Sequence, residues 1–134
     1  MLKLALSAFL AAGLWAGAAQ AQTAPVAMAN PAAQNCAKLG GTTEQLTRGT
    51  LGTTGICRLK SGRACEEWAL LRGECPEDGV DEKPYATVEA RYCVLRGGIL
   101  SLEAGETDER KGTCFLPESR SCGVEAYWLG QCPK

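Results

Sequence analysis

The chain contains no histidine, and this absence removes several kinds of chemistry. Without an imidazole there is no Ser-His or Cys-His pair to activate a nucleophile. Lys and Arg number 14 and Asp and Glu number 15, so the net charge is only −1. That balance gives no positive surface for a nucleic acid or for anionic lipids. We therefore expect no nucleic-acid partner.

Cysteine pairs with the spacing of a metal site are also missing. Structural zinc sites favour two cysteines that are two to four residues apart, and no such pair occurs here. The sequence also lacks the C-x-x-C pair of redox enzymes. We expect no metal and no other cofactor.

Only one long hydrophobic run is present, from Leu4 to Ala18, behind the positive charge of Lys3. The small-x-small sequence that ends at Ala21 predicts a signal peptide over residues 1–21. The run is too short to span a bilayer comfortably and no second run follows, so we expect no membrane insertion of the mature chain. The predicted location is the periplasm or the exterior of the cell. Residues 22–29 are small and featureless, which indicates a mobile leader.

The eight cysteines all follow the signal peptide, and an even number in a short exported chain predicts disulfides. An offset of 57 residues brings every cysteine onto another without a gap. The four cysteines Cys36, Cys57, Cys65 and Cys75 meet Cys93, Cys114, Cys122 and Cys132. We interpret this register as a tandem duplication. It predicts module 1 at residues 30–77, a short exposed linker at 78–86 and module 2 at 87–134, each too small to do without disulfides.

Each module has the same predicted order of elements. Asn30 is a suitable N-cap and Pro31 suits the first position of a helix that ends at a Gly-Gly pair. Two strands follow near residues 42–47 and 55–59. A turn then leads to a short helix that starts at Cys65 and ends at Gly73. The predicted fold class is α+β, with two tandem small disulfide-stapled α-β-β-α modules.

Within each module the cysteines allow three pairings. We favour Cys36–Cys57 and Cys65–Cys75, with the equivalent pairs in module 2, because Cys36 lies on the apolar face of a helix that should cover Cys57. An unbroken helix from Cys65 to Cys75 would hold the two Cα atoms about 15 Å apart, whereas a disulfide allows about 7 Å. This pairing therefore requires a reversal at Gly73. The alternative is Cys57–Cys65 with Cys36–Cys75.

Glu67 and Trp68 are the candidate partner-binding residues. The favoured interpretation of Trp68 is structural, with the ring closing the core of a small module. The alternative is an exposed aromatic anchor for a partner. A carboxylate mechanism could use Glu66, Glu67 and Glu125. However, Glu66 and Glu67 are adjacent and point in different directions, and both suit the start of a helix, so we expect no catalytic residues.

The sequence resembles a bacterial family in several motifs of module 1. These are Asn30-Pro31-Ala32-Ala33-Gln34-Asn35-Cys36, Gly40-Gly41, Gly55-Ile56-Cys57, Gly62 and the run from Cys65-Glu66-Glu67-Trp68-Ala69 to Cys75. The family is the domain of unknown function 333, whose members are often labelled "putative hemolysin". Module 2 is a degenerate version, with Gly123-Val124-Glu125 in place of Glu66-Glu67-Trp68. The resemblance implies bacterial export and no established activity. No amphipathic, strongly basic or membrane-length segment supports the hemolysin label.

Together these features predict a non-catalytic periplasmic or secreted module that binds another protein or a component of the cell envelope. One alternative is an envelope enzyme that uses carboxylates, and another is an accessory envelope stress protein without a defined ligand. An exposed Trp68 would favour binding, whereas a cleft of convergent carboxylates would favour an enzyme.

Overall fold

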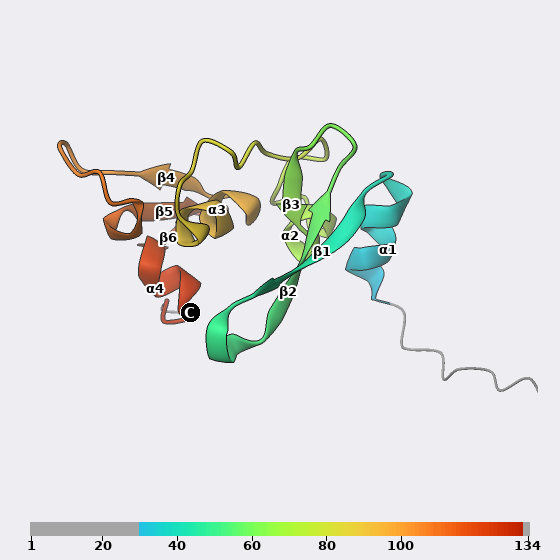
Figure 1. The fold of residues 1–134 in the computed structure, drawn as a ribbon, viewed down its shortest axis with the longest axis horizontal. Coiled ribbons are helices and arrows are strands. Elements are labelled where there is room, and N and C mark those ends of the chain that lie inside the picture. Colours follow the sequence, from blue (N-terminus) through green and yellow to red (C-terminus); the bar gives the residue numbers. More distant parts are fainter. Residues whose placement is uncertain (1–29, 133–134) are drawn as a thin grey trace, which may run out of the picture.

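The computed structural model describes residues 30–132 (Figure 1), so the predicted signal peptide and leader lie outside the described residues. Each module has a helix, three strands and a second helix. Module 1 contains α1 (Pro31–Lys38), β1 (Thr42–Thr47), η1 (Gly49–Leu51), β2 (Thr53–Arg58), β3 (Ala64–Glu66) and α2 (Glu67–Leu71). Module 2 contains α3 (Val88–Leu95), β4 (Ile99–Ser101), η2 (Glu109–Lys111), β5 (Thr113–Leu116), β6 (Arg120–Gly123) and α4 (Val124–Trp128). The α+β class is confirmed.

The prediction of two strands per module is wrong, because each sheet has three antiparallel strands, in the orders β1-β2-β3 and β4-β5-β6. The third strand of module 1 takes up the residues from Ala64 to Glu66 that the sequence assigned to a turn and a helix. A tight turn pairs this strand with β2, so that Cys57 lies opposite Cys65. Three residues are too few to show the alternation of a strand.

The first helix begins and ends as its sequence predicts. The Asn30 Oδ1 atom accepts hydrogen bonds from the N–H groups of Ala32 and Ala33, at 3.0 and 3.3 Å. At the other end Gly40 has a φ of +77°, which favours glycine. A Cβ atom on Gly41 would lie 2.5 Å from the Sγ atom of Cys57. The second glycine therefore lets the disulfide lie directly against the backbone.

The four disulfides are Cys36–Cys57, Cys65–Cys75, Cys93–Cys114 and Cys122–Cys132, which confirms the favoured pairing. The sequence separations are 21 and 10 in both modules. Because Cys65 belongs to β3 and α2 ends at Leu71, the chain reverses at Gly73 and brings the Cα atoms of Cys65 and Cys75 to 6.0 Å. Half-cystines are four of the seven buried residues in the core of module 1 and two of the four in the core of module 2.

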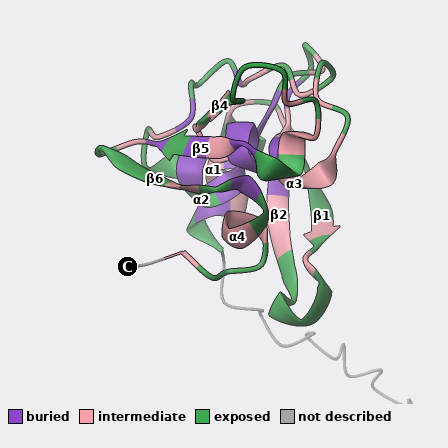
Figure 2. Ribbon diagram, turned by 90° about the vertical axis from the view of Figure 1, so that its left-hand side faces the viewer, coloured by how far each residue is buried: buried purple, intermediate pink, exposed green. Residues whose placement is uncertain are grey.

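The two modules pack against each other through a shared apolar cluster. Ile56 and Ala64 of module 1 and Leu95 of module 2 are all buried in it. The β1–β2 hairpin extends from module 1 towards α4 (Figure 1), and its far end is largely exposed (Figure 2). The predicted linker is not exposed along its whole length, because Val80 forms an antiparallel bridge with Ala64. The backbone hydrogen bonds of that bridge hold the linker against β3.

Candidate functional site

The Glu66-Glu67-Trp68 segment spans the junction of β3 and α2. Glu66 is completely buried and is the N-cap of α2, where its carboxylate accepts hydrogen bonds from the N–H groups of Trp68 and Ala69 at 3.2 and 2.8 Å. It also accepts from the Thr54 hydroxyl and pairs with Arg96 of module 2, both at 3.2 Å. Its carboxylate therefore caps a helix of one module and binds a cation of the other.

Glu67, a candidate partner-binding residue, is 2% exposed, so its side chain presents almost no surface to a partner. Its carboxylate accepts a hydrogen bond from the Thr43 hydroxyl of β1. A Cβ atom on Gly55 would overlap this carboxylate, so the glycine provides the space that Glu67 fills. Glu67 therefore attaches the start of α2 to the β1–β2 ladder.

Trp68 is 41% exposed, and the favoured prediction that its ring closes the core is wrong. Ala69 and Leu70, rather than Trp68, are the residues of α2 that are buried in the core with the disulfides. Leu71, one turn further along α2, is 39% exposed. We call these two side chains the α2 surface. The sequence signal that could have found it is the spacing of three residues between Trp68 and Leu71.

A hollow of about 340 Å³ lies beside the α2 surface, between α1 and α2. Its lining includes Asn35 of α1 and the C-cap residue Leu39, Leu70 and Leu71 of α2, and Gly73 just beyond. The carboxylate-bearing residue Glu77 also lines it. No sequence motif indicated this hollow, because it forms only where the two helices of module 1 come together.

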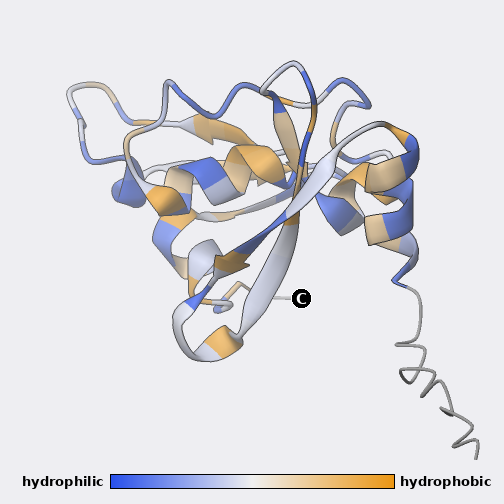
Figure 3. Cartoon of the chain, turned by 45° about the vertical axis from the view of Figure 1, so that its right-hand side comes forward, coloured by the Kyte–Doolittle hydropathy of each residue, from blue (hydrophilic) through white to orange (hydrophobic). Residues whose placement is uncertain are grey.

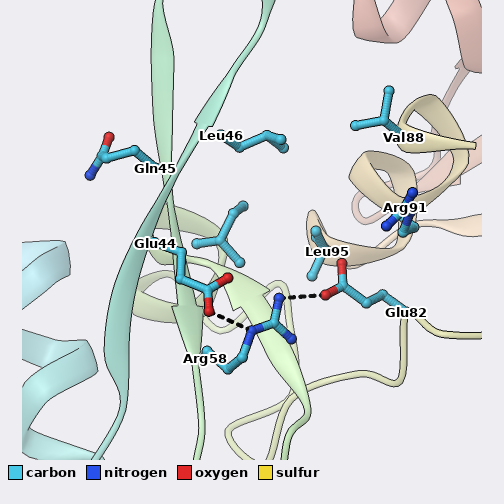
Figure 4. A pocket seen from close by; sticks show the side chains of 9 residues that line it. Glu44, Gln45, Leu46, Arg58, Glu82, Val88, Arg91 and Leu95 are labelled. Carbon is cyan, nitrogen blue, oxygen red and sulfur yellow. Dashed lines mark hydrogen bonds and ion pairs between the residues drawn. The ribbon is translucent and has the colours of Figure 1, made fainter.

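A second, smaller hollow of about 140 Å³ lies between the β1–β2 hairpin and α3 (Figure 4). Arg58 lies across it, bonded to Glu44 at 2.9 Å and to Glu82 of the linker at 2.6 Å. These two carboxylates raise the pKa of the Arg58 guanidinium above its ordinary value. Arg58, Glu44 and Glu82 are therefore paired with one another in this hollow, and the pair with Glu82 attaches the linker to the sheet.

Among residues 30–132, no cluster of three or more His, Cys, Asp or Glu side chains is arranged to hold a metal ion. None of the helices that the structure describes is long and apolar enough to cross a membrane. Four disulfides indicate an oxidising, extracytoplasmic compartment.

These features define a small disulfide-stapled α+β module with an exposed aromatic residue on a fixed helix. Residues 27–74 match the family model described as "Domain of unknown function (DUF333)". The match supports the assignment of module 1 to that family, and it does not extend into module 2. No curated protein and no solved structure matches the chain.

Proposed function

We propose that this protein is a non-catalytic periplasmic or secreted binding module. It recognises another protein, or a component of the cell envelope, through the α2 surface with Trp68 as the anchor. The observation that carries the proposal is the 41% exposure of Trp68 on a helix that the rest of module 1 holds in place. Tryptophan is among the residues that contribute most to binding energy at interfaces.

The helix beneath Trp68 is fixed on three sides. Glu66 caps its N-terminus, Glu67 is bonded to the neighbouring strand, and the Cys65–Cys75 disulfide closes the loop beyond it. Because this surface is already ordered, little conformational entropy would be lost when a partner binds. Such preorganisation supports a recognition role for α2.

The same contacts favour binding over an enzyme that uses carboxylates. Glu66 and Glu67 are buried and engaged in hydrogen bonds within the protein, rather than converging on a hollow. We also infer that the chain arose by tandem duplication and that module 1 carries the binding function. Module 2 has Glu125 at the position of Trp68, so it lacks the aromatic anchor.

Affinity capture from an envelope extract, with the oxidised mature protein as bait, tests the proposal. Trp68→Ala should abolish capture of a partner while the oxidised protein stays folded, with a smaller loss of thermal stability than a buried Trp→Ala would cause, since the residue is 41% exposed. Phe115→Ala is the matched control, because Phe115 is a 50% exposed aromatic residue on the sheet of module 2. Retention of the partner by Trp68→Ala, or its loss only with Phe115→Ala, would contradict the proposal.

A further inference from the structure

The surface of α4 in module 2 is occupied by the tip of the β1–β2 hairpin from module 1. The Arg48 Nη2 atom donates to the carbonyl oxygens of Tyr127 and Trp128, at 2.9 and 2.6 Å. The guanidinium also lies 4.2 Å from the ring centre of Tyr92. Leu51, on the same tip, packs against Gly130 of module 2. A Cβ atom added to Gly130 would lie 3.1 Å from the Leu51 side chain. The tip is pale or blue apart from one hydrophobic patch (Figure 3).

The hollow of module 1 is the counterpart of this occupied surface. Its residues Asn35, Leu70, Leu71 and Gly73 correspond, at the offset of 57, to Tyr92, Tyr127, Trp128 and Gly130. The backbones agree, because φ is +73° at the first glycine and +70° at the second. No atom of the described residues lies within 4 Å of a Cβ position on Gly73. The space that Leu51 fills in module 2 is therefore open in module 1.

We propose that this hollow receives a hairpin tip or loop of a partner protein that carries an arginine followed by an apolar residue. The arginine bonds to the carbonyls of Leu70 and Leu71, and the apolar side chain lies against Gly73. The last carbonyls of a helix have no intrahelical partner and carry partial negative charge, which favours a cation. The carboxylate of Glu77 adds a charge of the same sign at the hollow. This inference rests on the proposed function and specifies the chemistry of the partner.

Three segments of the chain are poor candidates for this occupant. In a second copy the Arg48 tip is already engaged on its own α4. The loop between β4 and β5 carries Glu103, Glu106 and Asp108 before its first basic residue, which suits a helix C-terminus poorly. Residues 22–29 contain no Lys or Arg. We therefore assign the occupant to a different protein.

A cyclised peptide of residues 46–55, which contains Arg48 and Leu51, is the probe for the first test. We expect saturable changes in the backbone amide shifts of residues 70–73 of the oxidised mature protein. An Arg48→Ala peptide should bind about tenfold more weakly, because bonds from a charged donor are lost. Leu71→Lys in the protein should abolish the shifts by repelling the cation. Leu102→Lys, at another exposed leucine, is the matched control and should leave the affinity within about twofold.

Shifts confined to residues 127–130, or no saturable shift, would overturn the inference. A second test places a photo-crosslinking residue at Leu71 and identifies the segment captured from the envelope. The expected product is a loop that contains Arg or Lys. A second copy of this chain, a glycan, a lipid or a segment without a basic residue would overturn the inference. The proposed function is tested separately, by the loss of capture in Trp68→Ala. It would therefore stand even if the crosslinking result overturned the inference about the hollow.

Discussion

Glu66→Gln replaces one buried carboxylate oxygen by an NH₂ group without changing the size of the side chain. The Oε2 atom accepts from Ala69 N–H and from Arg96, and the Oε1 atom accepts from Trp68 N–H and from Thr54. An amide has only one oxygen, so one pair of donors must face an NH₂ group. Hydrogen bonds to a charged group contribute about 1.5–3 kcal/mol each, and removing one partner of a buried ion pair costs about 3–5 kcal/mol. We expect the free energy of unfolding to fall by about 3–5 kcal/mol.

Urea denaturation at neutral pH with the disulfides intact measures this change. Glu44→Gln is the matched control, because the Glu44 side chain is 51% exposed and its ion pair should contribute less than about 1 kcal/mol. Arg96→Met should cost less in the Glu66→Gln background than in the wild type, because the two side chains interact directly. A Glu66→Gln protein within about 1 kcal/mol of the wild type would refute the reasoning.

Three further predictions concern other contacts. Gly55→Ala should lower the free energy of unfolding by about 2 kcal/mol or more, because the added methyl group displaces the Glu67 carboxylate. Gly123→Ala is the control in the same denaturation assay and should cost less than about 1 kcal/mol, because its methyl group would make only an ordinary van der Waals contact. Arg48→Ala should speed amide hydrogen exchange in α4 and in the β1–β2 hairpin, and unchanged rates would contradict its role between the modules. Burial alone would raise the pKa of Glu109, but hydrogen bonds from the N–H groups of Ala86 and Thr87, just before α3, and from the Thr87 hydroxyl lower it. The stability that Glu109 contributes is therefore present above about pH 4.3 and is lost as the pH falls through the folded-state pKa. The difference in unfolding free energy between pH 7 and pH 3 should therefore be smaller in Glu109→Gln, and an equal difference would contradict this assignment.

Local features of the sequence were predictable because their causes are local. Asn30 and Pro31 specify the start of a helix, and the structure shows that cap. The favoured disulfide pairing rested on the apolar face of the first helix and required a reversal at Gly73, and the structure shows both the pairing and the reversal. The atoms of the helix cap lie within a few residues of one another in the chain. For the disulfides, the geometry of a helix limits which cysteines can approach each other.

The candidate site was less predictable because its determinants are far apart in the chain. Glu67 is buried because Gly55, twelve positions earlier, leaves a space for its carboxylate. Trp68 is exposed, whereas Ala69, Leu70 and four half-cystines lie in the core of module 1. A count of apolar residues cannot show that half-cystines have replaced them. The contacts of Arg48 with α4 depend on how the two modules pack, which neither module specifies alone.

The contact of Arg48 with α4 makes the arrangement of the two modules asymmetric. Module 1 extends a long hairpin onto module 2, but the strand β4 has only three residues and the loop after it points away from module 1 (Figure 1). Contact between the modules is thus made by unlike surfaces, and such head-to-tail packing does not close on itself. The two ends of the molecule therefore differ chemically. Module 1 has the open hollow beside α2, whereas module 2 has an uncharged sheet face on which Ile99 and Phe115 are exposed.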